Sequence, residues 1–296
     1  MKAPLDKIRN GVNDIMQIIV TRVCDKDCSD CTQLLPFRHD AKHMSLDVFR
    51  EAVRSMKGWP GVVALFGGNP VAHPQFEDLC AILTHEIPDQ RQRGLWTNNL
   101  FNDSRGAIAR ETFYPSGRMN LNAHTDEAAS ALFDKWLPGK MIDSSRTRAS
   151  WHSPVLMDYR DFGLVEADWT IARENCDINQ RWSGAIAERE GKAYGYFCEV
   201  AASLDGIRKQ NNGVLATPGW WRMPMPYFYE QVVHCCDAGC GIPLRRKGSL
   251  DVDETYDIST SWAPYTDNTR IAVKLHTAMP EATEMPTDYQ ARFSRK

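Results

Sequence analysis

Three closely spaced cysteines follow directly on an apolar run near the start of the chain. Residues 15–20 are mostly β-branched or otherwise apolar, which predicts a short buried strand. The chain then places Cys24, Cys28 and Cys31 at C-x3-C-x2-C spacing. A strand that ends in such a loop favours a fold whose strand ends carry the chemistry, as the carboxyl ends of strands do in α/β barrels.

Three thiolates on one tight loop can hold three irons of a [4Fe–4S] cluster. The fourth iron then stays open to another ligand. Zinc is the alternative, because clustered cysteines in cytosolic proteins often bind zinc. Three ligands at this spacing, with no partner pair nearby, make a poor closed tetrahedron, so the sequence favours the iron–sulfur cluster.

Apolar runs and amphipathic segments alternate over the first half of the chain. Strands are expected at residues 15–20, 62–66, 94–97 and 118–124, with a fifth within 150–159. Helices are expected after the N-cap Ser45, over 74–85 and over 126–136. This alternation predicts parallel βαβ units in an α/β domain, with the polar strand ends gathered at one mouth.

The overall composition is that of a soluble globular protein. The chain has 296 residues, 43% hydrophobic and 25% charged, enough for one large or two modest domains. The net charge of -3 predicts no general attraction to nucleic acid. No apolar run reaches the roughly 18 residues of a membrane span, and no signal peptide opens the chain, so we expect a cytoplasmic protein.

The nine cysteines form two groups and one isolated residue. In a reducing compartment such clustering favours metal binding over disulfides. The isolated Cys80 lies in an amphipathic segment and is expected to pack as a small apolar residue. The second group comprises Cys176, Cys198, Cys235, Cys236 and Cys240. It flanks residues 182–198, which alternate around Glu190 and Gly191 as a β-hairpin does.

The first cysteine loop and the segment Gly67-Gly68-Asn69-Pro70 together resemble the radical S-adenosylmethionine (SAM) superfamily. The segment ends the second expected strand and is similar to the family's Gly-Gly-Glu-Pro motif, with Asn69 in place of Glu. Asp30 also departs from the family, which usually has an aromatic residue before the third cysteine. The resemblance implies a partial (β/α)6 TIM-type barrel over 1–170, with SAM on the open iron. It also implies that the backbone of the two glycines approaches the SAM amino group.

Two further segments are expected to bind the cofactor. Thr97 and Asn98 belong to a stretch that resembles the family's Thr-Asn-Gly segment, which flanks the methionine and ribose of SAM. Asn120, Asn122 and His124 share one face of the fourth strand and would point into the barrel. That polar row suits ribose hydroxyls or substrate, and a structural hydrogen-bond network is the equal alternative.

The second cysteine group resembles the auxiliary-cluster domains called SPASM and twitch. The resemblance implies a small cysteine-rich α+β domain over 171–296, with a second [4Fe–4S] cluster. Its expected ligands are Cys176, Cys198, Cys236 and Cys240, with Cys235 as the substitute. Five cysteines fit a single-cluster, twitch-like domain, and zinc bound by four cysteines is the alternative.

The resemblance implies a reaction in which SAM is cleaved reductively to a 5′-deoxyadenosyl radical, which abstracts a hydrogen from the substrate. An electron donor such as flavodoxin or ferredoxin is implied with it. Only about fourteen residues precede the first strand, which favours a small polar substrate over a peptide with a leader-binding domain. We expect a sugar, a cyclitol or a nucleoside, with oxidation or rearrangement as the outcome. Similarity of some segments to radical SAM proteins of phage-type genomes points to a modified nucleobase.

Two alternatives remain at this level. One is a peptide-modifying radical SAM maturase. The other, of a different class, is a cluster- or zinc-bearing module that binds nucleic acid without turnover, using the aromatic residues Trp220, Trp221, Tyr227, Phe228 and Tyr229. No single catalytic residue is identified from the sequence. Residues His73, His124 and His152 are acid–base candidates, and Arg22 and Arg160 are candidate anion ligands.

Overall fold

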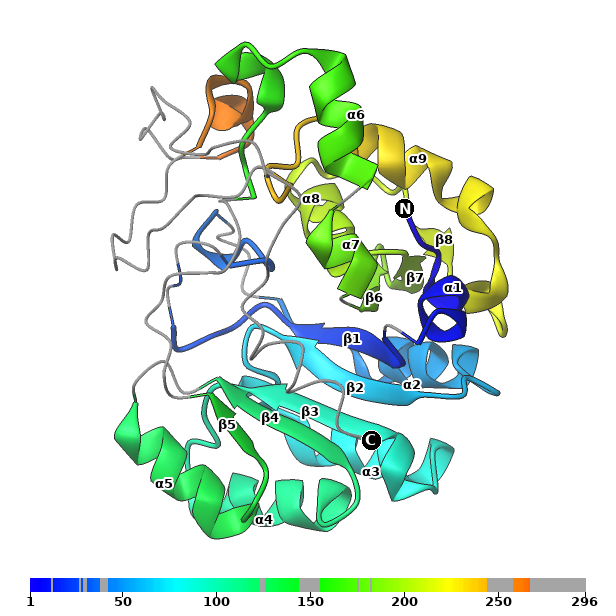
Figure 1. Cartoon of the computed structure of the whole chain (residues 1–296). Helices are drawn as coiled ribbons and strands as arrows, with labels where there is room; N and C mark the ends of the chain where they lie inside the picture. Colours follow the sequence, from blue (N-terminus) through cyan, green and yellow to red (C-terminus); the bar gives the residue numbers. More distant parts are fainter. Residues whose placement is uncertain are drawn as a thin grey trace.

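An eight-stranded mixed sheet organises the protein in the computed structural model (Figure 1). The strand order is β5-β4-β3-β2-β1-β6-β7-β8. The structure describes residues 1–11, 13–26, 28, 31–37, 42–122, 126–143, 155–174, 176–181, 183–243 and 258–266.

The first five strands run parallel and are joined by helices. In chain order the elements are α1 (Pro4–Arg9), β1 (Ile15–Thr21), α2 (Leu46–Ser55), β2 (Val62–Gly67), α3 (Phe76–Glu86), β3 (Arg93–Thr97), α4 (Asp103–Phe113), β4 (Arg118–Asn122), α5 (Glu127–Trp136) and β5 (Met141–Asp143). Figure 1 shows α2, α3, α4 and α5 on one face of a curved, open sheet. The α/β class and the partial-barrel arrangement expected from the sequence are thereby confirmed.

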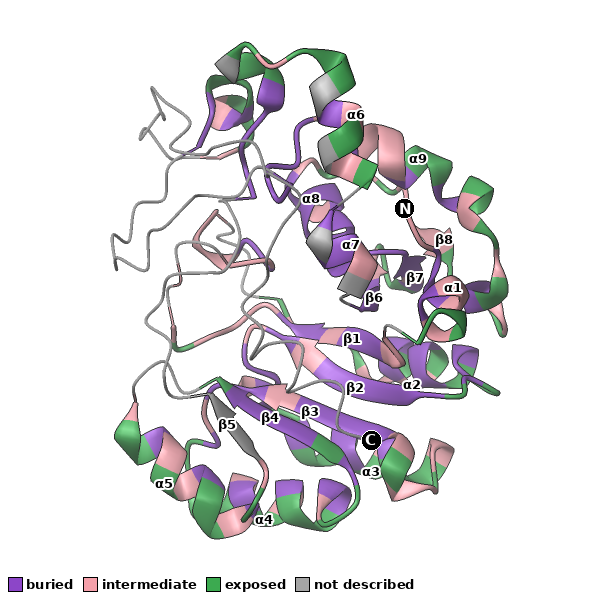
Figure 2. Ribbon diagram, in the orientation of Figure 1, coloured by how far each residue is buried: buried purple, intermediate pink, exposed green. Residues whose placement is uncertain are grey.

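Burial explains why these segments form strands and helices. The β1 side chains Met16, Ile18 and Val20 are fully buried, and most residues of β1, β2 and β3 are buried (Figure 2). Ser45 is the N-cap of helix α2, and its hydroxyl accepts the Val48 N–H at 3.3 Å. Its apolar stripe packs onto the sheet, as the sequence predicted.

The fifth strand was placed too late by the sequence. It lies at Met141–Asp143, and residues 155–159, the described part of the expected range 150–159, form no strand. The helix α4 was not anticipated either. The expected packing role of Cys80 is confirmed, because its side chain is only 3% exposed within α3.

The second half of the chain continues the same sheet. It contains α6 (Glu166–Glu174), α7 (Asp177–Arg181), β6 (Gly184–Arg189), β7 (Lys192–Tyr196), α8 (Glu199–Ile207), β8 (Val214–Leu215) and α9 (Tyr229–Gln231), followed by a π-helical turn at Val232–Cys236. The strand β6 pairs in parallel with the free side of β1. The predicted division into a barrel domain over 1–170 and an auxiliary domain over 171–296 stays a prediction.

The predicted β-hairpin is confirmed. Strands β6 and β7 pair antiparallel through the two-residue turn Glu190-Gly191. Both residues have positive φ, at 48° and 73°, as a tight hairpin turn of matching twist requires. Within the described parts of the chain, no helix is both long and apolar enough to cross a membrane.

Candidate functional site

The two glycines that end β2 lie directly against the backbone that leads from β1 into the cysteine loop. Gly68 N–H donates to the Thr21 carbonyl at 2.9 Å, and Asn69 N–H donates to the Val23 carbonyl at 2.7 Å. A Cβ on Gly67 would lie 2.2 Å from the Thr21 oxygen, and one on Gly68 would lie 2.3 Å from the Val23 oxygen. The loop backbone therefore fills the space that a Cβ would take at either position, and the fold itself requires glycine here. Contact of these glycines with SAM stays a prediction.

Asn69 and Thr97 form an internal link between the ends of β2 and β3. The Thr97 hydroxyl donates to Asn69 Oδ1 at 2.7 Å, and Asn69 Nδ2 donates to the Asn99 carbonyl at 2.9 Å. Asn69 Oδ1 also accepts the Val71 N–H at 3.1 Å, which starts the 3-10 turn at Pro70–Ala72. Asn69 is fully buried. These side chains hold the strand ends together.

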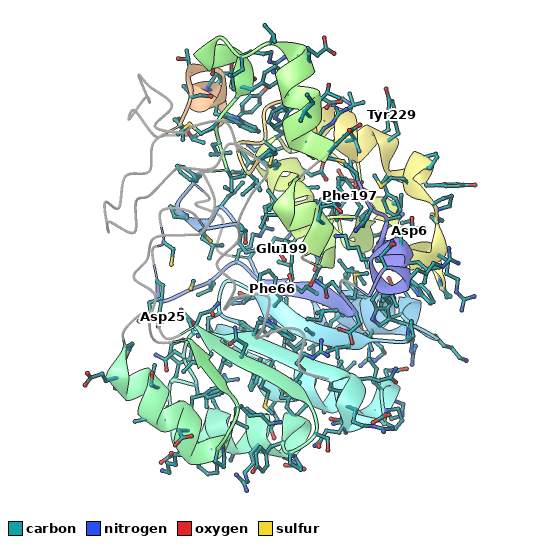
Figure 3. All side chains as sticks on the ribbon, viewed as in Figure 1. Asp6, Asp25, Phe66, Phe197, Glu199 and Tyr229 are labelled. Carbon is teal, nitrogen blue, oxygen red and sulfur yellow. The ribbon has the colours of Figure 1, made fainter. Side chains whose placement is uncertain are left out.

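Two charged residues inside the cysteine loop tie it to the same strand ends. Asp25 accepts from Asn69 Nδ2 at 3.5 Å and from Asn99 Nδ2 at 3.4 Å. Lys26 forms an ion pair of 2.9 Å with Asp126, the N-cap of α5. Figure 3 shows Asp25 beyond the carboxyl ends of the strands. The loop is thus held over the mouth of the parallel strands.

The three loop cysteines are half-buried. Asn98 Nδ2 donates to the Cys24 Sγ at 3.3 Å, which joins the end of β3 to the first thiol. The Cys31 N–H donates to the Cys28 carbonyl at 3.3 Å. Burial raises the pKa of Cys24 to about 11 and also raises the pKa of Cys31, so these metal-free thiols are protonated at neutral pH. Metal binding would displace these protons.

Two buried amide oxygens at this mouth have no hydrogen-bond partner among the residues that the structure describes. They are Oδ1 of Asn98 and Oδ1 of Asn120, on side chains 6% and 9% exposed. Asn120 Nδ2 donates to Asn122 Oδ1 at 3.1 Å, so these two share one strand face as predicted. His124 lies outside the described residues. A buried acceptor without a donor is costly, so this pair suits a ligand that carries hydroxyl or ammonium groups.

The second cysteine group lines one pocket. Its cysteines come from the residue before α7, the N-cap of α8, the π-helical turn and the loop after it, and all are buried: Cys176, Cys198, Cys235, Cys236 and Cys240. Apolar side chains such as Trp169 and Phe197 complete the lining. Among the described residues, no three Cys, His, Asp or Glu side chains form a ready-made metal site.

The surroundings of the two adjacent cysteines differ. Cys235 donates to the Ala201 carbonyl at 3.5 Å. Burial raises the pKa of both thiols, and the charge that adds most to this is Asp205 for Cys235 but Cys240 for Cys236. The choice of Cys236 over Cys235 as a metal ligand stays a prediction.

Two buried charged residues were missed by sequence reasoning. Lys7 of α1 is 1% exposed, and its Nζ donates to the Phe197 carbonyl at 2.8 Å; burial lowers its pKa to about 8. Glu199 is 0% exposed and accepts from the Thr32 hydroxyl at 3.1 Å, and burial raises its pKa to about 7. Figure 3 shows Glu199 between the sheet and the segment that contains Phe197. Since Thr32 and Glu199 each follow a cysteine, this hydrogen bond connects the two cysteine groups.

Some sequence candidates have structural roles. The ring of His73 is buried, with Nε2 3.0 Å from the Met44 carbonyl oxygen. The Arg160 guanidinium pairs with the buried carboxylate of Asp158. His152 lies outside the described residues.

The aromatic cluster belongs mainly to the core. Trp220, Trp221 and Phe228 are at most 2% exposed and cannot stack on bases, whereas Tyr227 and Tyr229 are each 63% exposed. This burial removes most of the surface that a nucleic-acid-binding module would use.

Comparisons with known proteins find only distant likeness. No family model matches the chain, and no curated protein does. Among solved structures, the chain is similar to BtrN in complex with AdoMet and 2-DOIA, at 13% identity and a TM-score of 0.45, over 82% of this chain and 97% of that one. It is also similar to native anSMEcpe with bound AdoMet and Cp18Cys peptide, at 13% identity and a TM-score of 0.42, over 85% of this chain and 95% of that one. A likeness at these values is distant, so the function has to be inferred from the chain's own residues.

Proposed function

We propose that the protein is a radical SAM enzyme that acts on a small polar substrate. The observation that carries this proposal is the position of the three-cysteine loop. It follows β1, is hydrogen-bonded to the Gly67–Asn69 segment at the end of β2, and accepts a hydrogen bond from Asn98, which follows β3. Three sequence motifs far apart in the chain thus meet at one sheet edge.

The loop fits an iron–sulfur cluster with one open iron. Cys24, Cys28 and Cys31 offer three soft thiolates, and Asn98 offers a hydrogen bond to the sulfur of the first. When bound and reduced, the cluster supplies the electron that cleaves SAM to methionine and a 5′-deoxyadenosyl radical. The Asn98 donor favours the reduced state, because hydrogen bonds to ligand sulfurs offset its added negative charge.

SAM would lie across the ends of β2, β3 and β4. The unpaired amide oxygens of Asn98 and Asn120 are suited to accept from its hydroxyl or ammonium groups. Asn69, Pro70 and Thr97 act by fixing the strand ends. The backbone of Gly67 and Gly68 packs against the segment that leads into the cysteine loop. We keep Asn122 and His124 as further candidate contacts.

A second cluster on Cys176, Cys198, Cys236 and Cys240 is part of the proposal. Four buried thiols around one pocket supply the ligands that a closed [4Fe–4S] cluster needs. Such a centre could take an electron from the substrate, which favours oxidation as the outcome. The glutamate that follows Cys198 is hydrogen-bonded to the first loop, so the two centres would lie near one another.

A small pocket beside the first loop carries charged and amide side chains, which supports a polar substrate. It lies between the ends of β1 and β6 and the helix α8, and its lining includes Arg22, Gln33, Lys42 and Glu188. The Gln33 Nε2 is buried and has no hydrogen-bond partner within the described part of the chain. Cations and amide donors of this kind recognise hydroxyl, carbonyl or phosphate oxygens, as in sugars, cyclitols and nucleosides. We further propose a cytoplasmic flavodoxin or ferredoxin as the electron donor.

The test is anaerobic incubation of reconstituted protein with SAM and dithionite, with 5′-deoxyadenosine measured by mass spectrometry. We expect product from the wild-type chain and from Cys80→Ala, a matched change of a buried cysteine outside both groups. The Cys24/Cys28/Cys31→Ala protein should give none. Product formation that survives this triple change, or its absence from the iron-loaded wild type, would refute the proposal. Deuterium transfer from labelled sugars, cyclitols, nucleosides or peptides into 5′-deoxyadenosine then separates the substrate classes.

A further inference from the structure

A lysine of the N-terminal helix is buried beside the second cysteine group. The Lys7 side chain is 1% exposed, and its Nζ donates to the carbonyl of Phe197, the residue before Cys198, at 2.8 Å. This contact joins residues 190 positions apart. Removing an ammonium group from water costs several kcal/mol unless negative charge lies close to it. The buried position therefore raises the question of which anion faces Lys7.

Among the described residues, the negative groups that act most strongly on Lys7 belong to the second cysteine group and its neighbour. In order of strength they are Cys198, Glu199 and Cys176. Glu199 already accepts a hydrogen bond from Thr32 through Oε1. The two cysteines are proposed metal ligands and become thiolates when metal binds. Lys7 is thus placed where the metal-bound centre would concentrate its negative charge.

We propose that Lys7 is the buried counter-charge of the second metal centre and that it raises the reduction potential of this centre. The inference rests on the proposed auxiliary cluster and goes beyond it, because it gives a residue that is not a cluster ligand a role in setting the reduction potential. Phe197 fixes the ammonium in place through its carbonyl oxygen. Lys7 gives up neither a proton nor an electron in this role.

The direction of the effect follows from charge. A [4Fe–4S] centre with four thiolates carries a net charge of about -2 when oxidised and about -3 after it accepts one electron. A fixed positive charge nearby stabilises the second state more than the first, and low solvent access strengthens the interaction. Loss of the Lys7 charge should therefore lower the reduction potential.

The test uses the full chain with Cys24/Cys28/Cys31→Ala, so that any iron present belongs to the second centre. Lys7→Gln removes the charge and keeps a donor for the Phe197 carbonyl, whereas Lys7→Arg keeps the charge. Lys57→Gln, at an exposed position after α2, is the matched control. Each protein is titrated anaerobically with dithionite, which supplies one electron per cluster and is oxidised to sulfite, in the presence of redox mediators. The reduced fraction is followed by electron paramagnetic resonance.

The comparison is made at the midpoint potential of the protein that keeps Lys7. At that potential, we expect the ratio of reduced to oxidised centre to be about tenfold lower in Lys7→Gln, which corresponds to a reduction potential about 59 mV lower. Lys7→Arg and Lys57→Gln should stay within about twofold. Iron loss from folded Lys7→Gln but not from Lys7→Arg would also support the counter-charge. If Lys7→Gln does not fold by circular dichroism, Lys7→Met replaces it.

Two results would overturn the inference alone. One is an unchanged ratio in an iron-loaded, uncharged variant, and the other is an equal shift in Lys7→Gln and Lys7→Arg, which would indicate packing instead of charge. If the Cys24/Cys28/Cys31→Ala protein with Lys7 unchanged binds no iron, that result would refute the proposed second cluster, and with it this inference.

Discussion

Replacing Asn69 with alanine should destabilise the protein by about 3 kcal/mol, before any cofactor binds. Asn69 accepts from Val71 N–H and the Thr97 hydroxyl, and donates to the Asn99 carbonyl. In the variant, Thr97 can still donate to the Asn99 oxygen, which lies 2.9 Å away. The Val71 N–H has no such substitute. An unpaired buried donor costs about 1–3 kcal/mol, and the lost hydrogen bond to the Asn99 carbonyl adds about 1 kcal/mol, which gives a range of about 2–4 kcal/mol.

The measurement is urea unfolding of the reduced, metal-free protein, followed by far-ultraviolet circular dichroism. The matched control is Asn102→Ala, because Asn102 makes one exposed N-cap hydrogen bond of 2.9 Å to Arg105 N–H and should cost about 1 kcal/mol. We expect both variants to keep the wild-type slope with urea. If Asn69→Ala were no less stable than Asn102→Ala, Asn69 would not be the structural link between β2 and β3 that its contacts indicate.

Three further predictions concern stability and metal content. Gly68→Ala should cost about 3 kcal/mol because its Cβ would meet a loop carbonyl at 2.3 Å, whereas Gly191→Ala meets nothing within 4 Å and should cost about 1 kcal/mol; equal unfolding midpoints would contradict this. Cys236→Ala should lose the auxiliary iron and Cys235→Ala should keep it, as counted by elemental analysis, and the reverse would exchange their roles. In the metal-free protein the folded-state pKa of Glu199 is about 7, above the ordinary 4.5, so the stabilisation from its bound proton is complete below pH 4.5 and lost as the pH rises to 7. The wild-type protein should lose unfolding free energy on the order of 3 kcal/mol over that pH range, and Glu199→Gln should not show this loss; unfolding at pH 5 and pH 7.5 measures the difference.

Local patterns in the sequence identify most of the parallel sheet. The apolar runs over 15–20, 62–66 and 94–97 become β1, β2 and β3 with boundaries shifted by a residue. The hairpin is equally local, because Glu190 and Gly191 form a turn between two alternating segments. The strand β5 was misplaced because it has only three residues, too few for periodicity to reveal.

Long-range contacts account for what the sequence could not reveal. Pairing of β6 with the free side of β1 joins segments whose partners, such as Met16 and Gly184, lie far apart in the chain. Nothing in the local sequence around Lys7 indicates burial, and only docking of α1 against Phe197 buries it. The motif comparison drew attention to Asn69, but its hydrogen bonds to Thr97 and Asn99 give it a structural role that the motif did not suggest.

Iron and sulfide content per chain is the most direct measurement of whether the two cysteine groups form two separate iron–sulfur centres. Anaerobically reconstituted wild-type protein should hold about eight irons and about eight sulfides. The Cys24/Cys28/Cys31→Ala protein and the Cys176/Cys198/Cys236/Cys240→Ala protein should each hold about four of both. An iron content unchanged by the first set of substitutions, or one zinc and no iron at the first loop, would contradict the account.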